Sequence, residues 1–224
     1  MQAAKAASPA RLLATSIGGK LAMSVTGLLL FGFVTAHLAG NLLLLAGPEA
    51  LNGYAHWMHT HPQAVWSMRS LLLAAFSLHV ATAIRLTRQN RAARPVRYAV
   101  EATVRASWAS RHMMLTGLLL LAFVVYHLLH FTLHVVPTGE IEGVGGRLDV
   151  YAMVVRAFRN PAVALAYVAA QVVLGVHLLH GGRSLFQSAG FRGPRRLALV
   201  LPLLVAAGNV MLPLLVLLRV AGNA

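Results

Sequence analysis

Four histidines within long apolar stretches are the residues of this sequence best suited to chemistry. They are His37, His79, His127 and His177, and mainly apolar residues surround each of them along the chain. A polar imidazole in such surroundings costs free energy, so a histidine inside a membrane-type segment indicates a function by default. One such residue could simply form a hydrogen bond between helices. Four in a repeated register are harder to explain in that way.

The register comes from an internal repeat. Residues 26–38 return as residues 116–128 with nine of thirteen positions identical, and both copies end in a histidine followed by a leucine. A weaker relation links His79 with His177, because each is followed six residues later by an arginine, Arg85 or Arg183. The pattern predicts two copies of a helix pair, and each copy carries two of the four histidines.

The composition is that of a membrane protein. Of the 224 residues, 58% are hydrophobic and only 11% are charged, which is too apolar for an ordinary soluble domain. A transmembrane helix needs about 20 apolar residues. Five segments qualify, namely 21–46, 64–86, 112–136, 161–185 and 197–218. We therefore predict one all-α membrane domain over residues 1–224, in which helices 1–2 and 3–4 form a parallel repeat.

The positive charges predict how the chain is oriented. The formal net charge is +14, which in a soluble protein would suggest nucleic acid. Here the cations flank apolar spans, so they favour topology and contact with phospholipid over nucleic acid. If the N-terminus is inside, fourteen of the nineteen lysines and arginines are inside as well. The positive-inside rule thus predicts a cytoplasmic N-terminus and an outside C-terminus.

Two polar segments flank the second predicted span. Residues 47–63 contain three histidines and are expected to be an exposed loop at the outer surface, or part of a site there: His56, His59 and His61. The segment after the span carries five arginines that could bind anionic phospholipid or an acidic cytoplasmic partner. These arginines are Arg85, Arg88, Arg91, Arg94 and Arg97.

Histidine is the only residue type available here for holding a redox metal in the membrane. The chain has no cysteine, which excludes thiolate metal sites, iron–sulfur ligation and haem attached covalently through C-x-x-C-H. Neutral imidazole is a good axial ligand for haem iron, and haem itself is mostly apolar. The four histidines therefore point to non-covalently bound haem.

Helix geometry sorts the four histidines into two levels. At the helical rise, His37 and His127 lie about 25 Å from the inner ends of their spans, and His79 and His177 only about 9 Å. We name them the outer pair and the inner pair. This arrangement predicts two stacked b haems, each with two axial histidines (the haem-iron ligands), through which electrons cross much of the bilayer.

Further polar residues lie beside the predicted ligands. His130 and His180 are one turn beyond a predicted ligand, but the matching residues of the other copy are Gly40 and Thr82. We therefore interpret His130 and His180 as second-shell or propionate partners of the haems. Two arginines could balance the inner propionates, or could simply extend toward water from the helix ends: Arg85 and Arg183.

Four segments together resemble one known family. They are His37–Leu42, the stretch from His79 to Pro95, Tyr126–Thr132, and His177–Gly181 with the following residues 184–187. They are similar to the single-chain, five-helix, di-haem cytochrome b subunit of bacterial succinate dehydrogenases and fumarate reductases. The resemblance extends over the first four predicted helices, and chain length and helix number agree with it.

This resemblance implies a function that spacing alone does not. It implies that the chain anchors a flavoprotein subunit and an iron–sulfur subunit on the cytoplasmic side of the bacterial cytoplasmic membrane. Succinate and fumarate are interconverted in the flavoprotein. Electrons pass from iron–sulfur clusters to the inner haem and then the outer one, and a quinone, expected to be menaquinone, is the membrane substrate. The family's ligand pattern falls on the same four histidines. The predicted spans contain no acidic residue, so the quinone site is not assigned.

Two other functions compete with this expectation. The chain could be the di-haem cytochrome b of another quinone-linked dehydrogenase, one that oxidises formate or hydrogen. It could also be a transporter or scaffold whose histidines bind protons or metal. The predicted spans lack the carboxylates and broken helix pairs that are usual in transporters, which disfavours the last interpretation.

Overall fold

The computed structural model describes residues 15–93, 111–136, 148–188 and 196–220, and within these ranges the regular structure is helical. Five helices are long and apolar enough to cross a membrane: Ile17–Ala46, Pro62–Ala92, Met113–Phe131, Pro161–Ser184 and Leu199–Leu217. The predicted all-α class and the number of spans are confirmed, and the helices indicate a multi-pass membrane protein.

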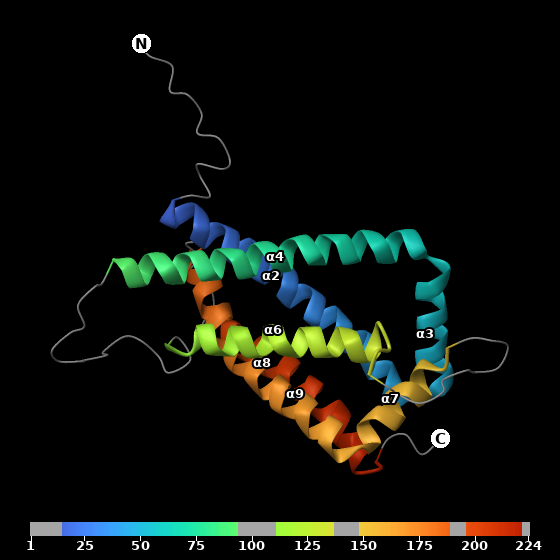
Figure 1. The fold of residues 1–224 in the computed structure, drawn as a ribbon. Coiled ribbons are helices and arrows are strands. Elements are labelled where there is room, and N and C mark those ends of the chain that lie inside the picture. Colours follow the sequence, from blue (N-terminus) through green and yellow to red (C-terminus); the bar gives the residue numbers. More distant parts are fainter. Residues whose placement is uncertain (1–14, 94–110, 137–147, 189–195, 221–224) are drawn as a thin grey trace.

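Seven α-helices and one 3₁₀ helix make up the described chain (Figure 1). Helix α2 (Ser16–Asn41) continues into the 3₁₀ helix Leu42–Ala46. After it come α3 (Pro48–Thr60) and α4 (Pro62–Ala92), then α6 (Met113–Phe131). The last three helices are α7 (Val150–Arg159), α8 (Pro161–Ser188) and α9 (Leu197–Leu217).

Local sequence signals fix most helix boundaries. The Thr15 side chain accepts a hydrogen bond from the Gly18 N–H and so caps the start of α2. Gly47 ends the 3₁₀ segment with φ at 98°, a conformation that only glycine adopts easily. Prolines occupy the first turns of α3, α4 and α8, where the missing N–H would have no helical partner. The Asp149 carboxylate caps α7 by accepting from the Ala152 N–H at 2.9 Å.

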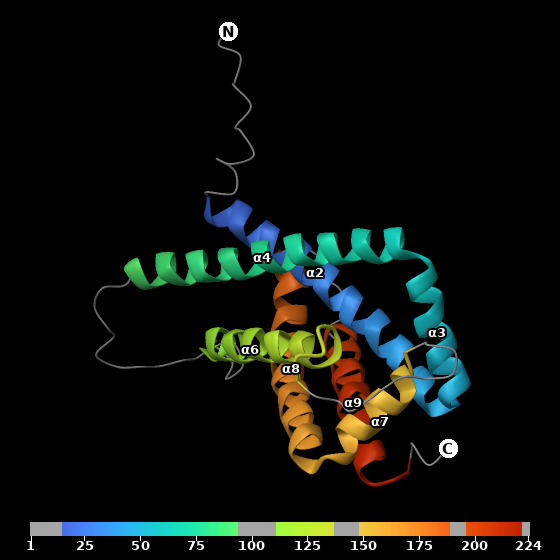
Figure 2. The same ribbon diagram turned by 45° about the vertical axis from the view of Figure 1, so that its right-hand side comes forward.

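Four of the spanning helices form a ring. Helix α2 packs against α4 and α8, and α6 packs against α8 and α4. Within the described residues, neither α2 and α6 nor α4 and α8 pack extensively against each other. The helices of each of these two combinations therefore lie opposite one another across the ring (Figures 1 and 2). Side chains from opposite helices can meet in the middle.

Helix α9 lies outside this ring, against α8, α2 and α7. Its small residues allow a close approach to the ring helices. A Cβ atom on Gly208 would lie 2.8 Å from a methyl carbon of Leu38, so a larger residue there would force Leu38 to move. Val205, Leu212 and Val216 bury their side chains in the same cluster as Leu38.

Helices α3 and α7 contact each other and close one end of the bundle, which we name the α3/α7 end (Figure 1). Asn52 on α3 connects them, since its amide donates to the Asp149 carboxylate and its carbonyl accepts from the Tyr151 N–H, both at 2.9 Å. Helix α7 also buries Val155 and Phe158. The buried face and the polar link hold this helix onto the bundle.

Two sequence-based expectations are wrong. Most of residues 47–63, expected as a loop, form α3, which starts at Pro48 and has Glu49 in its first turn. The third span ends at Phe131 and not at residue 136. The chain turns back there, because the Val135 N–H bonds to the Leu129 carbonyl and His134 adopts a positive φ of 52°. Arg94 and Arg97 lie outside the described residues.

Candidate functional site

The structure brings His37 and His127 together across the ring. Their ring centroids are 5.8 Å apart and their planes are almost perpendicular, at 84°. A phenylalanine one turn earlier packs on each ring, with centroid distances of 5.5 Å for Phe33 on His37 and 5.9 Å for Phe123 on His127. These phenylalanines occupy matching positions of the repeat. The two copies thus surround their histidines in the same way.

His79 and His177 lie on α4 and α8, which are opposite helices of the bundle. Each ring is held by a threonine from a neighbouring helix. Thr26 Oγ1 lies 3.0 Å from His79 Nδ1, and Thr116 Oγ1 lies 3.1 Å from His177 Nδ1. Thr26 and Thr116 are the first residues of the two repeat copies. The same contact therefore occurs in both halves of the chain.

The glycine after each threonine lets the helix backbone pass close to the imidazole. A Cβ atom on Gly27 would lie 3.5 Å from His79 Cε1, and one on Gly117 would lie 3.7 Å from His177 Cε1. These are ordinary contact distances, so alanine would fit at both positions and larger side chains would press on the rings. Each Thr-Gly pair thus provides both a hydrogen-bond partner and space.

The threonine hydrogen bonds favour one tautomer of each imidazole. Thr26 can donate its hydroxyl proton to the Ala22 carbonyl at 2.7 Å, and Thr116 can donate to the carbonyl of His112 or Met113, each at 3.1 Å. A hydroxyl has one proton, so its oxygen accepts from the histidine Nδ1–H. The Nε2 atoms of His79 and His177 then keep their lone pairs. This is the form in which neutral imidazole binds metal, with the other nitrogen donating to a second group.

The separation of the outer pair suits axial ligation of haem. Two metal–nitrogen bonds of about 2 Å, with the depth of each ring added, place the centres of axial imidazoles about 6 Å apart. The separation of 5.8 Å between His37 and His127 agrees with this value. Within the described residues, no group of three or more His, Asp or Glu side chains gathers as a zinc site would require.

Sequence reasoning missed Tyr167, which connects two histidines of α6. Its hydroxyl lies 3.0 Å from His130 Nδ1 and 3.4 Å from His127 Nδ1. A tyrosine in an apolar span is an ordinary core residue, so its type gives no signal. The depth of Tyr167 does give a signal. Tyr167 lies ten residues before His177, which is about 15 Å along the helix and at the level of the outer pair.

The remaining polar candidates lie near the end of the bundle opposite α3 and α7. Arg85 packs against Gly19 at the start of α2, and its buried Nε atom has no hydrogen-bond partner among the described residues. His180 is half-buried and precedes Arg183 by three residues on α8. The structure therefore offers cationic groups near His79 and His177, as the sequence suggested.

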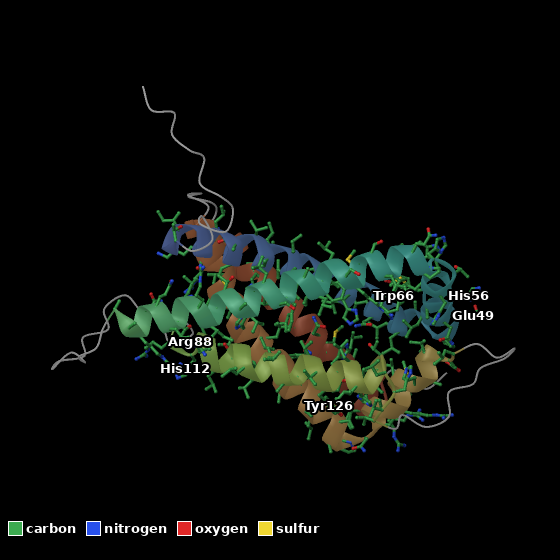
Figure 3. All side chains as sticks on the ribbon, turned by 45° about the horizontal axis from the view of Figure 1, so that its top comes forward. Glu49, His56, Trp66, Arg88, His112 and Tyr126 are labelled. Atoms are coloured by element: carbon green, nitrogen blue, oxygen red, sulfur yellow. The ribbon has the colours of Figure 1, made fainter. Side chains whose placement is uncertain are left out.

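The three histidines of residues 47–63 are exposed and lie on or beside α3. Figure 3 shows His56 next to Glu49 at the α3/α7 end, and Arg88 and His112 at the opposite end. His61 stacks on Trp57 at 4.5 Å, and its Nδ1 lies 2.8 Å from the Trp57 carbonyl. This local packing gives His61 a structural role at the start of α4.

Comparison with known proteins adds no further information: no protein-family model matches the chain, and no curated protein or solved structure is significantly similar to it.

Replacing Thr26 by valine should destabilise the protein, because the Nδ1–H of His79 then loses its acceptor inside the bundle. A buried polar group left without a partner costs about 1–3 kcal/mol. Unfolding in detergent, followed by circular dichroism, measures the loss. Thr26→Ser keeps the hydroxyl and should retain most of the stability.

Thr35→Val is the matched control for this change. Thr35 is exposed, and among the described residues its hydroxyl bonds to the Phe31 carbonyl of its own helix alone. This variant should unfold like the unmodified protein. Equal stability of Thr26→Val and Thr35→Val would show that the contact between Thr26 and His79 is unimportant.

Proposed function

We propose that this chain is the membrane-anchor and electron-transfer subunit of a succinate:quinone oxidoreductase and binds two b haems. The supporting observation is the pairing of four histidines at two depths, each pair from opposite helices. The ring centroids of His37 and His127 are 5.8 Å apart, and His79 and His177 lie on the opposite helices α4 and α8, each with a threonine hydroxyl on its Nδ1 atom. Bound haem supplies one-electron transfer, and two such groups at different depths provide a route across most of the bilayer.

The chain's own residues bind and orient the two groups. All four histidines act as axial ligands, and Thr26 and Thr116 hold the inner pair with Nε2 available to iron. Phe33 and Phe123 pack on the rings of the outer pair. These contacts fix the ligands before the haem binds, so little ordering remains to oppose binding.

Cationic residues near the inner pair would balance the propionates of the inner haem. The buried Nε of Arg85 has no partner within the described chain, and a carboxylate is its natural acceptor. Arg183 occupies the matching position of the second copy. His180 and His130 are second-shell or propionate partners in this proposal, because each lies one turn from a ligand.

The choice of succinate over other donors rests on the resemblance of four segments to the di-haem subunit of succinate dehydrogenases and fumarate reductases. In this proposal a flavoprotein and an iron–sulfur subunit bind on the cytoplasmic side of the bacterial inner membrane. Arginines along the last turns of α4, such as Arg88 and Arg91, would contact that partner or the phospholipid. A membrane quinone, expected to be menaquinone, exchanges the electrons.

The proposal predicts two b haems per polypeptide. The purified chain should show reduced b-type absorption bands, and a pyridine haemochrome assay should give about two haems per chain. His79→Ala should lose the inner haem and keep the outer one, because the two levels use separate ligands. His56→Ala, at an exposed position of α3, is the control and should keep both. A colourless wild-type preparation would refute the proposal.

Copurification distinguishes the succinate enzyme from the other quinone-linked dehydrogenases. A tagged chain extracted gently from its native membrane should bring with it a flavin-bearing subunit with succinate dehydrogenase activity and an iron–sulfur subunit. A formate dehydrogenase or hydrogenase in their place would exclude the succinate assignment and leave the haem ligation intact.

The proposed orientation places the α3/α7 end outside. Because the chain has no cysteine, single cysteines report unambiguously on it. Thr60 and Gln89 are exposed near opposite ends of the bundle. A membrane-impermeant maleimide should label Thr60→Cys in intact spheroplasts and label Gln89→Cys only after the membrane is opened. The reverse labelling pattern would show that the α3/α7 end is inside.

A further inference from the structure

We propose that Tyr167 is a positioning residue for the outer histidine pair, holding His127 through its Nδ1 atom and acting asymmetrically on that pair. This inference rests on the proposed function, since it concerns the orientation of a haem ligand. Its geometric basis is the continuous contact from His127 Nδ1 to the Tyr167 hydroxyl at 3.4 Å, and from that hydroxyl to His130 Nδ1 at 3.0 Å.

The Tyr167 hydroxyl is held firmly in place. Only 5% of Tyr167 and 2% of His130 are exposed. Aromatic rings surround Tyr167 with centroid distances of 5.1 Å to Phe123, 5.6 Å to Phe131 and 5.0 Å to Phe158. A hydroxyl buried among aromatic rings must find its partners nearby, because leaving it unpaired is costly. The two histidine nitrogens of α6 are those partners.

The positions of the protons set the donor and the acceptor in the two hydrogen bonds of the Tyr167 hydroxyl. If His127 uses Nε2 toward His37, its Nδ1 carries the proton and donates to the Tyr167 oxygen. Tyr167 then donates its own proton to His130 Nδ1, which leaves the His130 proton on Nε2. The His127 end then matches the inner pair, where a threonine oxygen accepts from Nδ1–H. His130 thus fixes the direction in which the Tyr167 hydroxyl points.

The first copy of the repeat lacks this arrangement. The residue matching Tyr167 there is Arg69, by the same offset that relates His79 to His177. The Arg69 guanidinium lies over Trp66, at 5.1 Å.

Gly40 replaces His130 in that copy, and Tyr54 of α3 fills the space, since a Cβ on Gly40 would lie 3.0 Å from its ring. Within the described chain, the His37 ring is contacted by Phe33 and His127 and shows no hydrogen bond. His127 alone is held through Nδ1, so the two ligands of the outer pair are not equivalent.

Tyr167→Phe tests the role of the hydroxyl while keeping the ring. An acceptor on Nδ1–H makes the imidazole more basic and a stronger ligand, which favours oxidised iron. Removing the acceptor should therefore raise the midpoint potential of one haem and leave that of the other haem unchanged. A redox titration measures both potentials, and both haems should be retained. Loss of the outer haem alone would also support the role.

Tyr126→Phe is the matched control, because the Tyr126 ring also packs near His130, at 5.4 Å, but no hydrogen bond to its hydroxyl is seen in the described structure. It should leave both potentials unchanged. Unchanged potentials in Tyr167→Phe, or an equal shift of both haems, would overturn the inference. A wild-type chain without haem would instead refute the proposed function.

A second measurement does not need haem. In ¹⁵N-histidine NMR of the full chain, with the His130 signal assigned through His130→Gln, wild-type His130 should carry its proton on Nε2. The His130 signal should change in Tyr167→Phe and stay the same in Tyr126→Phe. An unaltered His130 signal in Tyr167→Phe would overturn the connection.

Discussion

The hydrogen bond between a hydroxyl and the Nδ1 atom of a half-buried histidine is the interaction on which this structure depends. It occurs as Thr26 with His79 and as Thr116 with His177, at 3.0 and 3.1 Å. An imidazole inside an apolar bundle needs a partner for its N–H, and a neighbouring helix provides it in each half. The bond also leaves Nε2 free to bind metal. One contact thus pairs a polar group inside the bundle and orients the imidazole.

The ring of helices brings residues from both halves of the chain together. Helices α2 and α6 lie opposite each other, as do α4 and α8, so histidines from different repeat copies meet in the middle. Glycines at positions 27 and 117 keep the backbone close to the rings. Helix α9 supports the ring from outside, and α3 and α7 close one end. The two copies of the predicted repeat differ at Gly40 and His130.

Much of this arrangement was accessible from the sequence, for a physical reason. Hydrocarbon restricts a spanning segment to a helix, so apolar length alone gave five spans, and helical rise placed the histidines at two depths. Residues at the membrane surface are not restricted in this way. Helix α3 was missed because its histidines and asparagine resemble a polar loop, and the end of α6 was misplaced because residues 132–136 are as apolar as the helix itself.

Tyr167 was missed for another reason. Its residue type does not mark it, and its importance comes from contact with a different helix, at His127 and His130. A density map of the purified chain tests the central claim most directly. We expect two porphyrins, one between His37 and His127 and one between His79 and His177, with Nε2 atoms on iron. Missing porphyrins, or iron bound by other side chains, would contradict it.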